Sequence, residues 1–102
     1  MNLSSAGRSS NELPSVRPVW KNNGSRQDIQ PTLNGFNWAN NGWVAPTPSD
    51  ADYKNGSYLS LANGAKVTIP MPTVSLNNGN TNYTFEFRLR VRNIQKYSTL
   101  VT

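Results

Sequence analysis

The chain has 102 residues, a formal net charge of +5 and a hydrophobic content of 35%, which allows one small domain with little apolar material for its core. It contains neither cysteine nor histidine. This composition excludes disulfides, thiol chemistry, the usual zinc sites and catalytic triads built on histidine. No apolar run reaches the roughly 18 residues that a membrane span needs, and the polar first ten residues predict no secretory signal.

Asparagine–glycine pairs are the most frequent local signal in the sequence. Six of the seven glycines directly follow an asparagine. Both residue types tolerate positive φ, so this pair is a strong signal for tight turns between strands. The sequence therefore predicts an all-β protein of short antiparallel strands, with turns at residues 23–24, 34–35, 41–42, 55–56, 63–64 and 78–79.

Residues 1–30 are rich in serine and asparagine, and their apolar residues are isolated from one another. Pro14 and Pro18 favour extended backbone and oppose a helix. A segment of this kind cannot bury enough apolar surface to fold by itself. We expect an extended polar arm that becomes ordered by lying on a neighbouring subunit, with Trp20 as the assembly anchor.

Two strands are predicted between residues 33 and 44. Phe36 and Trp38 are two residues apart, so we expect them on one face of the first strand. The Asn40–Gly42 stretch predicts a turn, and Trp43 and Val44 begin the second strand.

Residues 57–69 predict a hairpin. Its apolar residues share one parity, and a three-residue loop of Ala62, Asn63 and Gly64 keeps them on one face, with the glycine in the left-handed conformation. This register places Leu61 opposite Ala65 and Leu59 opposite Val67. Pro70 and Pro72 then end the strand.

Residues 83–92 alternate strictly between apolar and polar side chains, which predicts a long strand with one buried aromatic face. The other face carries Arg88, Arg90 and Arg92, about 7 Å apart along the strand. This row is a candidate basic interface. A solvated sheet face or a protein interface explains it better than nucleic acid, because the aromatic residues lie on the opposite face. Residues 100–102 predict the opening of another strand.

The five carboxylates suggest no catalytic pair. Glu86 has no acidic neighbour on its own face, and no histidine or lysine base accompanies any serine. The acids at 50 and 52 could ligate calcium, but their proline- and serine-rich surroundings favour solvated loop acids. We therefore predict a protein that is not an enzyme and that has no cofactor.

Several aromatic residues could stack on sugar rings, among them Trp20, Trp38, Trp43, Tyr53 and Tyr58. Packing in the core or at a sheet edge is the alternative for Trp38 and Trp43. Because Trp43 follows a turn and Tyr53 lies in a polar loop, these two are the candidates for a ligand surface.

An ordered set of phrases supports a family resemblance. It comprises AGRSSNE at 6–12, Trp20, LNGFNWANNGWV at 33–44, YLSLANGAKVTIP at 58–70, YTFEF at 83–87 and RNI at 92–94. In this order the phrases resemble the opening of concanavalin A-like, or laminin-G-like, jelly-roll domains of bacteriophage tail and minor structural proteins. The resemblance spans residues 6–102, and the family's domain is about twice as long.

The resemblance implies an antiparallel β-sandwich, incomplete in this chain. With the polar composition of residues 1–30, this predicts two domains, the arm at 1–30 and the partial sandwich at 31–102. It implies a bacteriophage virion structural protein, associated with the tail or a fibre, whose partners are other virion subunits. The alternative is a carbohydrate-binding module for host attachment, whose partner would be a host surface glycan. A nucleic-acid binder is the third hypothesis. No metal or sugar ligand is carried over, because no residue of that kind matches.

Overall fold

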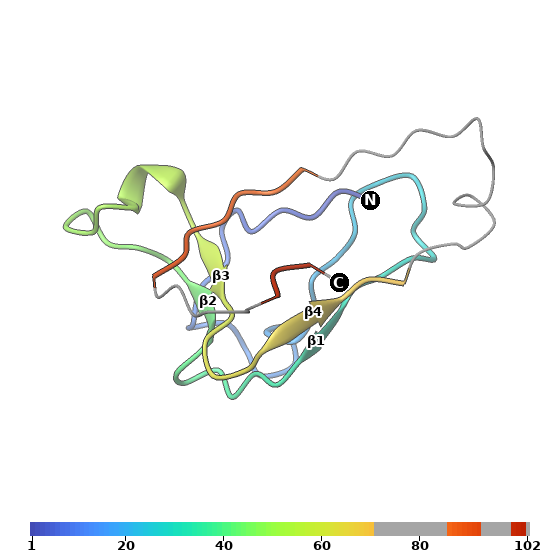
Figure 1. Cartoon of the computed structure of the whole chain (residues 1–102), viewed down its shortest axis with the longest axis horizontal. Coiled ribbons are helices and arrows are strands. Elements are labelled where there is room, and N and C mark those ends of the chain that lie inside the picture. The colour runs from blue at the N-terminus through green and yellow to red at the C-terminus, as the bar shows by residue number, and fades with distance from the viewer. Residues whose placement is uncertain (71–85, 93–98, 102) are drawn as a thin grey trace. The chain divides into compact units, whose positions relative to one another are not determined.

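The computed structural model describes residues 1–70, 86–92 and 99–101. Regular structure in this part of the chain comprises four short strands and one 3-10 helix (Figure 1): β1 Thr32–Asn34, β2 Gly42–Val44, η1 Tyr53–Asn55, β3 Tyr58–Ser60 and β4 Lys66–Thr68. β1 pairs with β4 and β2 pairs with β3, both antiparallel. Small antiparallel sheets without an α-helix in the described residues fit the predicted all-β class. None of these residues lies in a helix that could cross a membrane.

The two sheets belong to one interrupted antiparallel ribbon. Asn34 lies opposite Lys66, and Gly42 lies opposite Ser60. Between these pairs, the seven residues 35–41 face the five residues 61–65. The unequal lengths shift the register by two residues, which keeps the parity of the side chains while it breaks the ladder of hydrogen bonds.

The side chain of Asn41 replaces the ladder at this interruption. Its amide nitrogen donates to the carbonyl oxygens of Gly35 and Ala62, both at 3.0 Å. One of these carbonyls belongs to its own strand segment and the other to the opposite segment. Asn41 is only 6% exposed, and its contacts satisfy backbone groups that an uninterrupted sheet would pair.

A turn forms at Asn63–Gly64 as predicted, but it is a two-residue turn and not the predicted three-residue loop, and the predicted hairpin does not form. The Ala65 N–H donates to the Ala62 carbonyl oxygen at 3.4 Å, and both Asn63 and Gly64 have positive φ, as in a type I′ turn. The flanking strands then separate: Leu59 pairs with Trp43 and not with Val67. The two strands of the expected hairpin pair with the 32–44 segment instead, β3 with β2 and β4 with β1. The 35–41 loop of that segment packs closely against the turn. A Cβ atom on Gly35 would lie 3.2 Å from the Gly64 carbonyl oxygen.

Two further strand predictions differ from the structure. Residues 35–41 form bends, so Phe36 and Trp38 do not lie on a strand, although their rings stack on each other. Residues 86–92 form no strand either, and 83–85 lie outside the described residues. Phe87, Leu89 and Val91 are exposed, where the prediction had them on a buried face. Residues 99–101 form no strand, and Thr102 lies outside the described residues.

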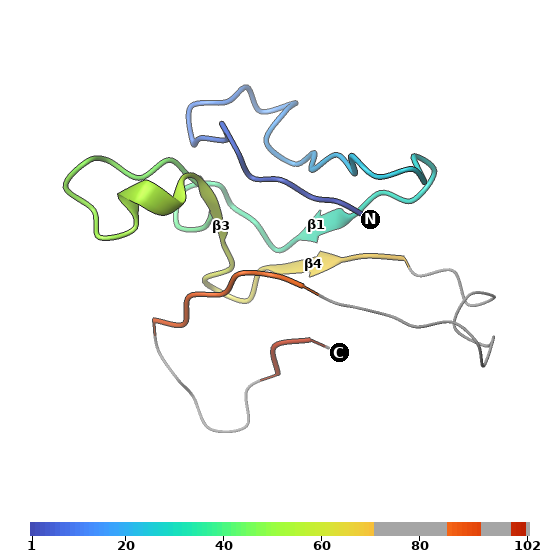
Figure 2. The same ribbon diagram turned by 90° about the horizontal axis from the view of Figure 1, so that it is seen from above.

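The first thirty residues fold back onto the strands instead of forming an extended arm (Figure 1, Figure 2). Residues Met1–Pro72 make up one compact unit, so residue 30 does not divide two units, and Thr73–Thr102 make up a second. The buried apolar side chains of the described residues are Trp43 and Ala65, and the buried polar ones are Asn22 and Asn41. Polar side chains therefore take a large share of the interior.

Asn41→Asp should lower the free energy of unfolding by about 3 kcal/mol, because a carboxylate oxygen would replace the donor between two carbonyl oxygens. The matched control is Asn40→Asp, an exposed neighbour whose replacement should change stability by less than about 0.5 kcal/mol. Urea unfolding followed by tryptophan fluorescence measures both. Equal stability of the two variants would contradict the assigned role of Asn41.

Candidate functional site

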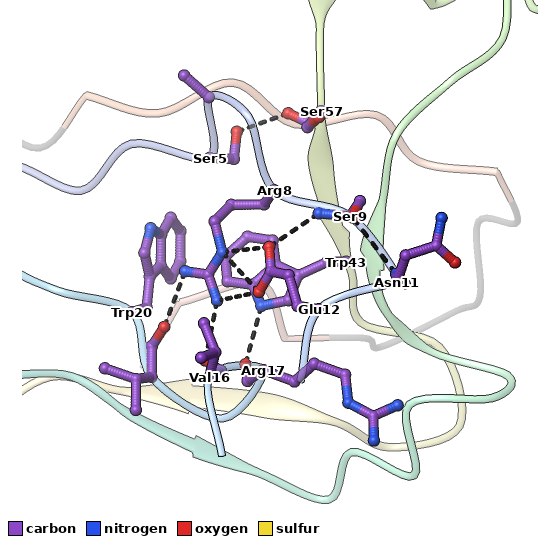
Figure 3. Close-up of polar contacts among 12 residues, drawn as sticks. Ser5, Arg8, Ser9, Asn11, Glu12, Val16, Arg17, Trp20, Trp43 and Ser57 are labelled. Atoms are coloured by element: carbon purple, nitrogen blue, oxygen red, sulfur yellow. Dashed lines mark hydrogen bonds and ion pairs between the residues drawn. The ribbon is translucent and has the colours of Figure 1, made fainter. Parts of the chain in front are cut away.

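The guanidinium group of Arg8 connects the N-terminal segment to β2 (Figure 3). Its Nε and Nη2 atoms donate to the Glu12 carboxylate at 2.8 to 3.1 Å. Nη1 also donates to the Val19 carbonyl oxygen at 2.8 Å, and Nη2 donates to that of Val16 at 3.2 Å. The guanidinium carbon lies 4.0 Å from the centre of the Trp43 ring, within the range of a cation–π interaction.

Trp43 is the centre of this cluster and is only 3% exposed. Its indole Nε1–H donates to the Arg17 carbonyl oxygen at 2.9 Å. The Trp20 ring meets it edge-on, with centroids 5.2 Å apart and an interplanar angle of 84°. Trp20 in turn donates its indole N–H to the Ser4 carbonyl oxygen at 2.8 Å. Both rings thus bury apolar surface while their polar atoms are satisfied by N-terminal backbone.

The carboxylate of Glu12 is committed to this cluster. It also accepts the Ser9 backbone N–H at 2.9 Å, and the hydrogen bonds from Arg8 are the main reason that its pKa lies below the ordinary value of 4.5. The side chains of Arg8 and Glu12 are 16% and 15% exposed. A carboxylate held as an anion in this way is a poor general acid, so the cluster is suited to holding the chain together and not to proton transfer.

Asn22 organises the second half of the N-terminal segment. Its side-chain oxygen accepts the backbone N–H groups of Asn2 and Gly24, and its amide nitrogen donates to the carbonyl oxygens of Arg26 and Ile29, all within 2.9 Å. The side chain is fully buried. It gathers backbone groups from three parts of the segment that form no ladder of their own.

The structure brings Trp20, the predicted anchor, together with Trp43, one of the two residues predicted for ligand binding. Trp20 packs on Trp43 within the same chain, where the prediction had it on a neighbouring subunit. Trp43 is buried and therefore differs from the exposed ligand surface that we predicted, because the chain folds Arg8 and Trp20 over it. Tyr53 lies in η1 and is 51% exposed, so its ring is accessible as expected.

Arg88, Arg90 and Arg92 lie in the exposed 86–92 segment. That segment is not a strand, so a regular row of three guanidinium groups along a sheet face is not present there. The basic interface remains a hypothesis that rests on their spacing in the sequence.

Sequence reasoning missed the Arg8–Glu12 pair, although the signal was present. The two residues are four apart with opposite charge, a spacing that brings side chains together in a turn as well as in a helix. The roles of Asn22 and Asn41 had no local signal, because their partners are up to 21 residues away. The sequence does not distinguish these two buried asparagines from the many asparagines in predicted turns.

Asp50 and Asp28 are also engaged. Asp50 accepts the Thr47 N–H at 2.9 Å, and the exposed Arg26 holds the pKa of Asp28 at about 2 through hydrogen bonds. Within residues 1–70, 86–92 and 99–101, no three acidic side chains cluster as a metal site would require. Residues 50 and 52 lie in a loop directly before η1, as predicted.

Comparison with known proteins yields no match: no protein-family model, no curated protein and no solved structure is similar to this chain. The resemblance to jelly-roll domains of phage structural proteins therefore remains a prediction from the sequence.

The Glu12 carboxylate should make stability depend on pH. Because its pKa is lowered by folding, its contribution is present above the ordinary value and is lost as pH falls through the lowered value. We expect the melting temperature to fall between roughly pH 5 and pH 3, and Glu12→Gln to be less stable at pH 7 with a flatter profile in this window. Asp28→Asn is the control at pH 7. It removes an ion pair whose side chains are 58% and 66% exposed, so it should lower the melting temperature less than Glu12→Gln does. Parallel profiles for Glu12→Gln and the unmodified chain would contradict this expectation.

Arg8→Lys should cost about 2 kcal/mol of unfolding free energy, because a lysine cannot donate simultaneously to the carboxylate and to two carbonyl oxygens. Arg26→Lys provides the matched control. It alters an ion pair whose side chains are 58% and 66% exposed, where we expect less than about 0.5 kcal/mol. Urea unfolding measures both variants, and a larger loss for Arg26→Lys would overturn the assignment.

Proposed function

We propose that this chain is a non-enzymatic structural protein of a bacteriophage virion, a tail- or fibre-associated β module that assembles with other subunits. The jelly-roll sandwich implied by the resemblance is part of this proposal, with strands from neighbouring subunits completing the sheets. The observation that carries the proposal is an apolar surface that the N-terminal segment presents to the outside.

This surface consists of Leu13, Val16 and Val19, which are 68%, 45% and 55% exposed. They follow one another at intervals of three residues in a turned segment. The Val16 N–H donates to the Leu13 carbonyl oxygen at 2.9 Å, and the Val19 N–H donates to that of Val16 at 3.0 Å. Turns closed by hydrogen bonds at this spacing bring such side chains to one side.

The backbone that carries this surface is fixed from behind. Arg8 donates to the carbonyl oxygens of Val16 and Val19, and Trp43 donates to that of Arg17. An exposed apolar cluster on rigid backbone loses little conformational entropy when a partner covers it. Exposed apolar surface is a usual sign of a protein–protein interface.

The engagement of Glu12, Asp28 and Asp50 in ion pairs and turns supports a role other than catalysis. The carbohydrate-binding alternative is implied by the resemblance, and the exposed ring of Tyr53 is the predicted ligand residue that supports it. The nucleic-acid hypothesis depends on the arginines of the 86–92 segment, and no contact in the described residues favours it.

An antibody against the full chain should label virions purified on a density gradient, and Val16→Asp should abolish this incorporation by placing a charge in the covered surface. Ser15→Asp is the matched control, because it adds the same charge to an exposed neighbour without removing apolar area. Both variants are first checked for unchanged urea unfolding. Absence of the unmodified chain from virions contradicts the proposed class, and equal incorporation of the two variants contradicts the surface.

A further inference from the structure

The asparagine–glycine pairs of this chain have a chemical property besides their preference for turns. The main-chain nitrogen of the glycine can attack the side-chain carbonyl carbon of the asparagine, and glycine has no Cβ atom to obstruct the approach. A pair whose reacting groups are held in other hydrogen bonds cannot easily reach the geometry of attack. The surroundings of each pair therefore decide which one reacts. Five pairs lie in the described residues, and Asn78–Gly79 lies outside them.

Two of the five pairs have an asparagine side chain that the fold holds in place. Asn41 is buried, and its carboxamide makes four hydrogen bonds, two donated across the ribbon and two accepted from the N–H groups of Asn37 and Trp38. In the pair at residues 34–35, the asparagine belongs to β1 and its amide donates to Thr68 Oγ1 at 3.3 Å. In both pairs the carbon that would be attacked is on a fixed side chain.

Two further pairs have a glycine nitrogen that is already engaged. In the pair at residues 23–24, the glycine N–H donates to the side-chain oxygen of the buried Asn22 at 2.8 Å. In the pair at residues 55–56, the glycine N–H donates to the Tyr53 carbonyl oxygen at 3.2 Å, at the end of η1. A nitrogen that attacks must first lose its proton, and a hydrogen bond to an acceptor within the fold opposes its transfer to solvent.

The pair Asn63–Gly64 is held at neither group. Both residues are exposed, and a Cβ atom on Gly64 would meet no heavy atom within 4 Å. The bond that closes the turn joins Ala65 to Ala62, so the peptide between the two central residues takes no part in it. Within the described residues, neither the Asn63 carboxamide nor the Gly64 N–H has a hydrogen-bond partner. An exposed turn of this kind opens locally at a small cost in free energy.

We propose that Asn63 is a site of spontaneous deamidation, at which the chain modifies itself with water as the other reactant. The Gly64 nitrogen gives up its proton and forms a bond to the Asn63 Cγ atom. The bond from Cγ to the amide nitrogen breaks, and that nitrogen takes up a proton and leaves as ammonia. Water then opens the cyclic succinimide at either carbonyl carbon, which breaks one C–N bond and gives aspartate or isoaspartate. The sum consumes one water, releases one ammonia and involves no oxidation.

The modification changes a junction of the fold. Both products add a negative charge to the turn, and isoaspartate also lengthens the main chain by one methylene group. The turn contacts the opposite segment through two of its carbonyl groups: that of Ala62 accepts the Asn41 amide, and that of Gly64 lies close to Gly35. With age, the chain therefore acquires an altered turn at the point where β3 and β4 separate. This inference does not depend on the proposed function.

The rates of deamidation in the folded full chain and in the chain unfolded in guanidinium chloride test the proposal. Both samples are incubated at the same mildly alkaline pH, digested briefly with trypsin at lower pH, and each asparagine is followed by fragment-ion mass spectrometry. In the folded chain we expect Asn63 to react about tenfold faster than Asn41 and faster than the other three described sites. In the unfolded chain the five rates should converge, because each asparagine precedes a glycine.

Two variants connect the measured rate to the residue. Asn63→Gly removes the carboxamide and keeps a residue that tolerates the φ of +59° at this position, so it should abolish the fastest phase of ammonia release without loss of the fold. Asn55→Gly is the matched control. It removes an exposed asparagine whose neighbouring N–H is engaged, and it should leave that phase unchanged.

Three results would overturn the proposal. The first is a rate at Asn63 in the folded chain that does not exceed the rates at the other described sites. The second is the same ranking and the same ratios in the unfolded chain, because the surroundings would then not set the order. The third is a fast phase of ammonia release that survives Asn63→Gly. None of them bears on the incorporation experiment with Val16→Asp.

Discussion

The packing of the first thirty residues depends on the guanidinium group of Arg8. This group meets the Glu12 carboxylate, two backbone carbonyl oxygens and the face of Trp43, so it joins charge, hydrogen bonding and aromatic contact at one position. Charge-assisted hydrogen bonds are stronger than neutral ones and gain further where water is partly excluded. A segment that is too polar to fold by apolar burial is held in place by this network instead.

The side chains of Asn41 and Asn22 also replace apolar burial with polar contacts, in their case to backbone groups. Strands of three residues leave many N–H and C=O groups without a ladder, and buried groups of that kind must find partners. A carboxamide can donate twice and accept twice, so one buried asparagine serves four backbone groups. The abundance of asparagine thus has two origins, in exposed turns and in buried junctions between irregular segments.

A polar interior has a consequence for the surface. Where polar side chains hold the interior, large apolar side chains such as Leu13 and Val16 stay outside, and the stacked rings of Phe36 and Trp38 remain half-buried on a fixed loop. In the proposed function, the first group offers area to a partner subunit. Its backbone is already ordered, so binding would not have to supply that order.

The sequence by itself determined the all-β class, the turn at Asn63–Gly64 and a short strand that includes Trp43 and Val44, because turn preference and alternation act over a few neighbouring residues. Tertiary structure alone decided the rest. Leu59 pairs with Trp43 because the 35–41 loop holds the turn through Asn41, a contact across 21 residues. Trp43 is buried, and Trp20 packs within its own chain, because Arg8 brings the N-terminal segment over β2. No local pattern encodes contacts of that range, since their free energy depends on which distant groups the fold brings together.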